Sequence, residues 1–363
     1  MQKKQFNFVK NQKNEISFNA APKKFYKTFL ERLFIKKTNI LILVVFSFFV
    51  VFSICYLFIS PYSANKSIIN SIYAYNLPSI FEPKVSVNIS DINKYNLLNS
   101  LNEYGFSFDS VFFKDGFISV TYNPYSLINA FEKVQNINTS NFYTFLGTNN
   151  FGIDNLTLYN KTLVNNTLVT FFICVISWLF GTFFGVIHAS FSKRNFSLSY
   201  HLISLFALIP SLIVVIIFFN LYSYTLYKFI CIMSFLLIIP FYLNSFIFSK
   251  KLKNTELYYS YISLGFSDFN LIYKFYLPRV LLQNLILIPE NNAIALMILA
   301  SLSFFDIEGI FKTLNIGNLF KDIIDNFKNY YYSFFVIFTF SGFLVLLKLI
   351  SFILFNALTI ERV

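Results

Sequence analysis

The residue types that perform catalysis are scarce in this chain and lack the spacing that catalysis requires. Only two histidines are present, His188 and His201, and no Ser/His/Asp set, zinc spacing or glycine-rich phosphate loop accompanies them. The three cysteines, Cys55, Cys174 and Cys231, all fall in long apolar runs and have no metal-ligand spacing. We therefore expect a chain that is not an enzyme, binds no metal or cofactor, and takes energy from another subunit or an ion gradient.

One acidic residue interrupts an apolar run and is a candidate for a role in transport. Glu290 lies inside the run 280–305, directly before Asn291 and Asn292. Ionisable residues inside membrane segments commonly line substrate or ion paths or pair with one another. Two interpretations stay open. In the first, Glu290 has a functional role, either lining a polar path with Asn291 and Asn292 or pairing with Lys348 on the last expected span. In the second, Glu290 is satisfied within the bundle and only positions helices.

Residues 250–279 interrupt the apolar pattern and predict a compact protrusion. Leu257 to Leu264 can form a short helix that ends at Gly265, and Ser267 or Asp268 can cap a second helix that ends before Pro278. Two short helices joined by a tight glycine turn make a rigid body at the membrane surface. A partner protein can push such a body.

The composition and the long uncharged runs indicate a helical membrane protein. Of 363 residues, 56% are hydrophobic and 13% are charged, whereas soluble domains carry about a quarter charged residues. A helix needs about 20 mostly apolar residues to cross the hydrocarbon of a bilayer. We therefore expect six transmembrane helices in the lipid bilayer, the first over 38–60. The runs that meet this length, two of them with one internal charge, are 38–65, 162–192, 195–227, 229–249, 280–305 and 329–360.

The distribution of charge predicts the orientation of these helices. Residues 1–37, the pair Lys193 and Arg194, and residues 250–279 carry net charges of +8, +2 and +3. The segments 61–161 and 306–328 together carry −2. Cytoplasmic loops are enriched in Lys and Arg, so we expect a multi-pass protein of the cell membrane with both termini in the cytoplasm. This placement explains the net charge of +12 without a nucleic-acid partner.

Residues 61–145 have the sequence pattern of a small extracellular α+β insert, and residues 1–37 that of a basic, poorly ordered cytoplasmic tail. Within the insert, residues 84–88 alternate as a strand, and Asp91 can cap a helix that ends at Gly105. Residues 106–113 and 117–122 read as a hairpin with Asp115-Gly116 at its turn, and a second helix is expected from Ser126. Three roles stay open for the insert. It can bind the substrate-binding partner, form part of the wall at the entrance of a transport path, or have no role in transport.

The protrusion resembles the ATPase-coupling motif of ABC importer permeases, which reads Glu-Ala-Ala, three residues, Gly, nine residues, Ile-x-Leu-Pro. Gly265 is followed by nine residues and then by Phe275, Tyr276, Leu277 and Pro278. Tyr259, Ser260 and Tyr261 stand in place of Glu-Ala-Ala. The resemblance implies that ATPase coupling falls to eight residues: Tyr259, Ser260, Tyr261, Gly265, Asp268, Phe275, Leu277 and Pro278.

A second stretch is similar to the signature of dipeptide and oligopeptide permeases of the C-subunit type, Gly-Thr-Asp-x-x-Gly-Arg-Asp-x-x-Ser. Gly147, Thr148, Gly152 and Asp154 match it, directly before the second expected span. Three further stretches that match the family, 208–212, 300–304 and 317–318, follow in the same order along the chain. At two positions where the family has acidic residues this chain has Ser204 and Leu299, so it would be a divergent member. Its composition, rich in Phe, Asn and Lys, is typical of a protein from an AT-rich bacterium.

The resemblance implies the type I importer fold, with residues 146–363 as the permease core and 250–279 as its coupling region. The chain would be one of two transmembrane subunits of an ATP-driven oligopeptide or dipeptide importer. Its partners would be a B-type permease, two ATPase subunits that bind ATP and Mg²⁺, an extracellular substrate-binding lipoprotein and the peptide. The alternatives are a permease for nickel or another small solute, a proton-coupled secondary carrier that uses Glu290, and a scaffold or adhesin.

Overall fold

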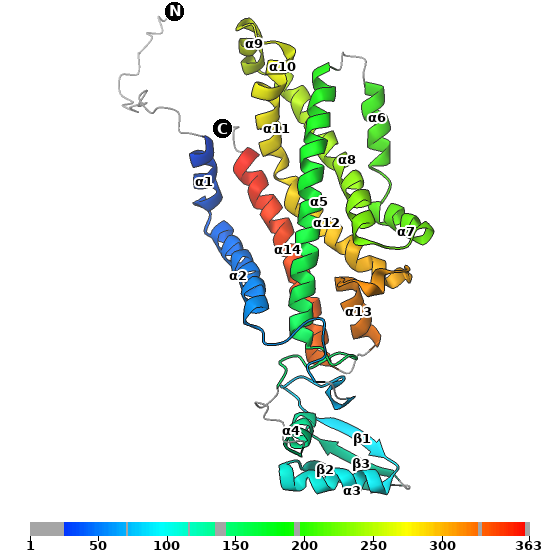
Figure 1. Cartoon of the computed structure of the whole chain (residues 1–363). Helices are drawn as coiled ribbons and strands as arrows, with labels where there is room; N and C mark the ends of the chain where they lie inside the picture. Colours follow the sequence, from blue (N-terminus) through cyan, green and yellow to red (C-terminus); the bar gives the residue numbers. More distant parts are fainter. Residues whose placement is uncertain are drawn as a thin grey trace, which may run out of the picture.

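The computed structural model describes residues 25–69, 72–114, 117–134, 143–191, 197–325 and 329–359. It is mostly helical (74%), with one small sheet at one end of a bundle of long helices (Figure 1). The long helices are α2 (Lys37–Ile59), α5 (Asn155–Phe191), α8 (Leu226–Lys253), α12 (Leu287–Leu302) and α14 (Tyr330–Thr359). Two shorter helices, α6 (Ser197–Phe206) and α7 (Ser211–Leu221), form a bent pair between α5 and α8 in the sequence. The other helices of the bundle are α1 (Phe25–Ile35), α9 (Glu256–Ser263), α10 (Asp268–Asn270), α11 (Leu277–Asn284) and α13 (Ile316–Asp325).

Five of these helices are long and apolar enough to cross a membrane, and the bent pair α6–α7 would make a sixth. This confirms a membrane protein with five or six spans. The first span matches the expected range 38–60 to within one residue. The helix α5 begins earlier than the expected start at residue 162, and its 37 residues span about 55 Å at 1.5 Å each. Its first turns therefore project beyond a hydrocarbon core of about 30 Å.

The expectation of one continuous helix over 195–227 is wrong. Its two halves, α6 and α7, are bent by 68° at a break that ends at Pro210. Proline has no N–H and disfavours helical backbone in the residue before it, so it ends α6 and starts α7. The run 280–305 is also divided, between α11 and α12, because Pro289 cannot donate a hydrogen bond to the carbonyl of Leu285.

The helices α5 and α8 form the tightest pair in the bundle. A Cβ added at Gly181 would lie 2.7 Å from the carbonyl oxygen of Ile238, and one added at Gly185 would lie 2.6 Å from the Cβ of Ser245. Small residues four apart allow two helix backbones to approach closely in a membrane. This pair forms the centre of the bundle, against which α11 and α12 pack.

The small sheet lies between α2 and α5 in the sequence, where the α+β insert was expected. Its strands β1 (Val85–Ile89), β2 (Phe108–Lys114) and β3 (Phe117–Tyr122) are antiparallel in the order β1-β3-β2. The helices α3 (Ile92–Ser100) and α4 (Pro124–Val134) contribute to the same core, which includes Leu98, Val120 and Leu127. The opposite face carries polar side chains such as Ser119 and Thr121, together with the exposed rings of Phe112 and Phe117.

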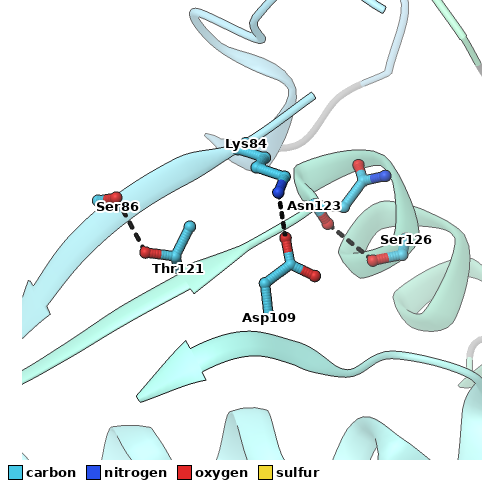
Figure 2. Close-up of polar contacts among 6 residues, drawn as sticks. All are labelled: Lys84, Ser86, Asp109, Thr121, Asn123 and Ser126. Atoms are coloured by element: carbon cyan, nitrogen blue, oxygen red, sulfur yellow. Dashed lines mark hydrogen bonds and ion pairs between the residues drawn. The ribbon is translucent and has the colours of Figure 1, made fainter. Parts of the chain in front are cut away.

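Side-chain contacts join the strands of this sheet to one another. Figure 2 shows Ser86 and Thr121, on β1 and β3, whose hydroxyl oxygens lie 3.0 Å apart, and Lys84, which lies 3.9 Å from Asp109 on β2. Figure 2 also shows the Ser126 hydroxyl, which donates to the carbonyl of Asn123 at 2.7 Å. The sheet is therefore held by side chains as well as by its backbone ladder.

Local predictions for the insert are largely confirmed. The Asp91 side chain accepts a hydrogen bond from the N–H of Asn93 at 2.9 Å and caps α3, and Gly105 has a φ of 91° at the end of the helical segment. The expected start of the second helix at Ser126 is wrong, because the Asn123 side chain accepts from the N–H of Tyr125 and α4 begins at Pro124. The expected turn Asp115-Gly116 lies outside the described residues.

The expected basic tail 1–37 contains a helix in its last part. In α1, Leu33 packs against Ile353 and Ala357 of α14. The net charge of residues 1–37 did not predict this apolar contact. Residues 1–24 and the loop residues Lys193 and Arg194 lie outside the described residues. The start of α1, the end of α14 and the α9–α10 region all lie toward one end of the bundle, and the sheet lies at the other (Figure 1).

Candidate functional site

The segment between α8 and α11 forms a protrusion, which we call the knob (residues 256–276). A glycine turn joins its two helical parts. Gly265 has a φ of 75°, its N–H donates to the carbonyl of Ile262 at 2.8 Å, and the N–H of Phe266 donates to the carbonyl of Tyr261 at 3.3 Å. These two bonds and the left-handed residue form a Schellman motif, which glycine favours because it has no Cβ. The helix end predicted at Gly265 is confirmed.

A buried aromatic cluster anchors the knob to the bundle. Phe275 is fully buried and lies with its ring centroid 5.1 Å from that of Tyr261. The Arg279 guanidinium lies 4.5 Å from the Phe275 ring centroid and donates to the Phe275 carbonyl at 2.8 Å. Val186 of α5 belongs to the same cluster. Phe275 and Tyr261 therefore position the knob, and Phe275 has no surface to offer a partner.

The other predicted coupling residues divide between the surface and the junction with α11. Tyr259, Ser260 and Asp268 are exposed, and the Ser260 hydroxyl donates to the carbonyl of Glu256 at 3.0 Å. At the junction, Leu277 is half-buried and Pro278 is exposed.

The expectation that the second helix ends before Pro278 is wrong. A π-helical turn, Leu271–Tyr276, leads directly into α11, and the N–H of Leu277 donates to the carbonyl of Ile272. The wider turn accommodates Pro278, whose ring would otherwise clash with a carbonyl four residues earlier. The knob is therefore continuous with α11.

Sequence reasoning missed the most exposed apolar side chains of the knob. Leu264 is 74% exposed, Phe269 is 69% exposed and Leu257 is 57% exposed. Exposed apolar patches mark protein–protein or membrane interaction sites. The signal was present in the sequence, since apolar residues flank the predicted glycine turn in a segment that leaves the membrane.

The signature residues 147–154 form a tight loop before α5. Thr148 and Asp154 pair in an antiparallel bridge, and the N–H of Asn149 donates to the carbonyl of Ile153 at 3.0 Å. The N–H of Gly152 donates to the carbonyl of Asn149 at 3.0 Å. A Cβ at Gly147 would collide with the carbonyl oxygen of Leu77.

This loop holds the segment that links α2 to the sheet. The Thr148 hydroxyl donates to the carbonyl of Ala74 at 2.6 Å and accepts from the N–H of Leu77 at 2.9 Å. The N–H of Ile68 donates to the carbonyl of Gly152 at 2.8 Å. The matched residues therefore shape the entry into α5.

Asp154 caps α5. Its Oδ2 accepts from the N–H of Thr157 at 2.7 Å and from the Thr157 hydroxyl at 2.6 Å, and the Ser60 hydroxyl lies 2.7 Å from the same hydroxyl. Asp154 is 1% exposed, and this burial raises the pKa of its carboxyl above the ordinary value. The hydrogen bonds from Thr157 oppose the rise because they stabilise the ionised form.

The charged residues in the membrane helices are brought together. Lys348 Nζ lies 3.7 Å from Glu290 Oε1, with the side chains 59% and 44% exposed. Asn291 and Asn292 are buried, and among the described residues Nδ2 of Asn291 and Oδ1 of Asn292 have no hydrogen-bond partner. The ion pair between Glu290 and Lys348 is therefore confirmed, while both the polar path and a role in positioning helices stay predictions.

A second buried polar cluster lies between α5, α8 and α11 and was missed. Asn284 Nδ2 donates to the Thr182 hydroxyl at 2.7 Å and to the Ser245 hydroxyl at 2.6 Å. Its Oδ1 accepts from Asn244 Nδ2 at 2.6 Å. The side chains satisfy one another across three helices, which stabilises their packing at the end of α11 away from the knob.

Two of the remaining family-like stretches meet in space. The Ser303 hydroxyl donates to Asn318 Oδ1 at 2.8 Å, and a Cβ at Gly317 would lie 2.6 Å from that hydroxyl oxygen. The stretch 208–212 lies at the break between α6 and α7. His188 bonds to Tyr242 of α8 and to Ser199 of α6, which makes it a helix-linking residue.

No protein-family model matches this chain, and no curated protein matches it. Among the described residues, no group of three or more His, Cys, Asp or Glu side chains is arranged to hold a metal ion.

Proposed function

We propose that this chain is the transmembrane subunit of an ATP-driven importer of oligopeptides or dipeptides, with residues 250–279 as its ATPase-coupling region. The observation that carries the proposal is the knob, a rigid body with an exposed apolar tip at the end of the bundle opposite the sheet. Its tip is formed by Leu264 and Phe269, and its base by the buried Phe275. A groove on an ATPase subunit is the partner that this shape fits.

The knob transmits movement through its continuous connection to α11. The guanidinium of Arg279 and the buried ring of Phe275 join the knob to the first turn of α11. Asn284 joins the other end of α11 to α5 and α8. Closure of two ATPase subunits on ATP would therefore rock these helices as a unit and alternate access to a central path.

The remaining partners follow from the same proposal. A B-type permease would supply the other half of the path, and an extracellular lipoprotein would deliver the peptide. In this orientation both termini and the knob are cytoplasmic, and the α+β insert is extracellular, in reach of the lipoprotein.

The contact with the ATPase can be tested at the tip of the knob. We expect Leu264→Asp and Phe269→Asp each to release the ATPase subunits from the solubilised complex, because they place a charge on an apolar contact. Phe112→Asp is the matched control, since Phe112 is 66% exposed on β2 of the small sheet, which lies at the end of the bundle opposite the knob (Figure 1). Retention of the ATPases by both knob variants would refute the assignment.

A proton-coupled carrier is the second candidate. It is favoured by the Glu290–Lys348 pair beside two buried asparagines, each with one side-chain atom that has no hydrogen-bond partner among the described residues. In such a carrier Glu290 would release Lys348 on protonation. Uptake by this carrier would be lost in Glu290→Gln and on collapse of the proton gradient, and would survive loss of the ATPases. The importer has the opposite dependence on the ATPases.

A further inference from the structure

The strand β2 forms one edge of the small sheet. In the order β1-β3-β2 it pairs with β3, and among the described residues no strand lies on its other side. In an antiparallel ladder alternate residues of a strand bond its neighbour, so the remaining residues point their N–H and C=O groups away from that neighbour. The free side of β2 is therefore a row of backbone donors and acceptors that a further strand can pair with.

Exposed aromatic rings lie along this edge on both faces of the sheet. On the face away from the buried core, Phe112 is 66% exposed and Phe117, on β3, is 54% exposed. On the other face Phe113 is 71% exposed, and the Tyr95 ring of α3 lies 6.2 Å from its ring and 5.4 Å from that of Phe108. Side chains alternate across a sheet, so a strand added beside β2 would place them on both groups of rings.

The other edge of the sheet, β1, differs from β2. Its outward side chains, Ser86 and Asn88, bond to side chains of β3, and none of its residues is an exposed large apolar one. Pro83 and Lys84 directly precede it. Proline and lysine protect sheet edges from pairing with other chains. The exposed rings are therefore a property of the β2 edge and not of the sheet as a whole.

The length of the free edge favours a short peptide over a second copy of this chain. A bulge between Phe108 and Ser110 interrupts the ladder, so the regular register covers residues 110–114. At about 3.3 Å per residue this edge is about 16 Å long, and with a sheet depth of about 10 Å it offers roughly 160 Å². A stable interface between two proteins buries about 800 Å² on each partner. The edge is too small for a dimer and matches an extended peptide of a few residues.

We propose that the free edge of β2 binds a short extended peptide as an added strand of the sheet, with the side chains of the peptide resting on the aromatic rings of its two faces. Backbone hydrogen bonds supply affinity that depends little on sequence, and the rings favour apolar side chains. The site therefore accepts many peptides. That the bound peptide is also the imported one rests on the proposed function, whereas the edge site itself rests only on the sheet.

The experiment measures binding of a fluorescein-labelled hexapeptide of alternating Val and Thr to the purified full chain in lipid nanodiscs, by fluorescence anisotropy. The matched probe has the same side chains and an N-methyl group on every internal residue, so it offers no internal N–H to β2. We expect saturable binding of the first peptide and binding weaker by roughly tenfold or more for the second, because at least two backbone hydrogen bonds are lost.

Variants of the chain test the position of the site. Phe112→Asp and Phe113→Asp place a charge on either face of the edge, and we expect each to weaken peptide binding by roughly tenfold through loss of apolar contact. Leu97→Asp is the matched control, since Leu97 is 70% exposed on α3, outside the ladder. It should bind the peptide as the wild type does.

The outcomes separate this proposal from the proposed function. Binding that needs the peptide N–H groups, Phe112 and Phe113, in a complex without ATPases, would support the edge site and contradict the importer. Absence of saturable binding, equal binding of the methylated peptide, or full binding by both Asp variants would overturn the edge site while leaving the ATPase contact untouched. A disulfide between two copies of Phe113→Cys in native membranes would assign the edge to a second copy and overturn the peptide.

Discussion

The replacement Gly265→Val tests whether the shape of the knob, rather than its presence, couples it to an ATPase. A side chain at Gly265 has free space, since no atom lies within 4 Å of an added Cβ, so the cost is in the backbone. An L-residue in the left-handed region costs about 1–2 kcal/mol, and valine is stiff at χ1. Relaxation of φ would instead sacrifice the two backbone bonds of the turn, worth about 0.5–1.5 kcal/mol each.

The strain of about 1–2 kcal/mol lowers the population of the native turn by roughly 5- to 30-fold, and loss of both bonds, about 1–3 kcal/mol together, lowers it by at least about 5-fold. The bundle should keep its stability because Gly265 is exposed. The assay is ATP-dependent uptake of a labelled peptide by the complex in proteoliposomes. We expect Gly265→Val to lose most of its uptake with normal insertion, and Gly265→Asn to keep it, because asparagine tolerates a positive φ. Equal uptake by wild type and Gly265→Val would refute the reasoning.

Three further predictions follow from the junction, the cap and the ion pair. Pro278→Ala restores an N–H that can donate to the carbonyl of Lys274, so the π-helical turn should relax to an α-helix and rotate the knob by about 100°. We expect this rotation to abolish uptake, and unchanged uptake would contradict the prediction. Burial raises the pKa of Asp154, so the protonated carboxyl favours the folded state. The Tm of the wild type should therefore fall as the pH rises from the ordinary pKa of 3.8 through the raised pKa. Tm values measured against pH for the wild type and for Asp154→Asn would test this. Glu290→Gln leaves Lys348 unpaired and should destabilise the protein by about 1 kcal/mol, while Glu290→Gln with Lys348→Met should recover it in thermal unfolding.

Local signals in the sequence predicted local structure well. Asp91 as a cap, the strand 117–122 and the glycine turn at Gly265 depend on residues a few positions apart, and all are confirmed. The knob was found for the same reason. Its exposed tip was missed because apolar residues such as Leu264 resemble the membrane segments around them.

Hydropathy and charge alone do not register breaks inside apolar runs. Pro210 divides the third run and Pro289 the fifth, although both runs are uncharged or nearly so. The contacts of Thr148 with residues 74–77 join segments more than 70 residues apart in the chain, and no local pattern encodes them. The Asn284 cluster likewise draws on three helices, and only the packing of α5 against α8 brings its members together.

The central claim is that this chain works in a membrane complex driven by separate ATPases. The most direct measurement is to tag the C-terminus, solubilise native membranes gently and identify the proteins that copurify. The account predicts two ATPase chains and a second permease with several membrane spans. A homo-oligomer free of ATPases would contradict it and direct attention to Glu290 and the proton gradient.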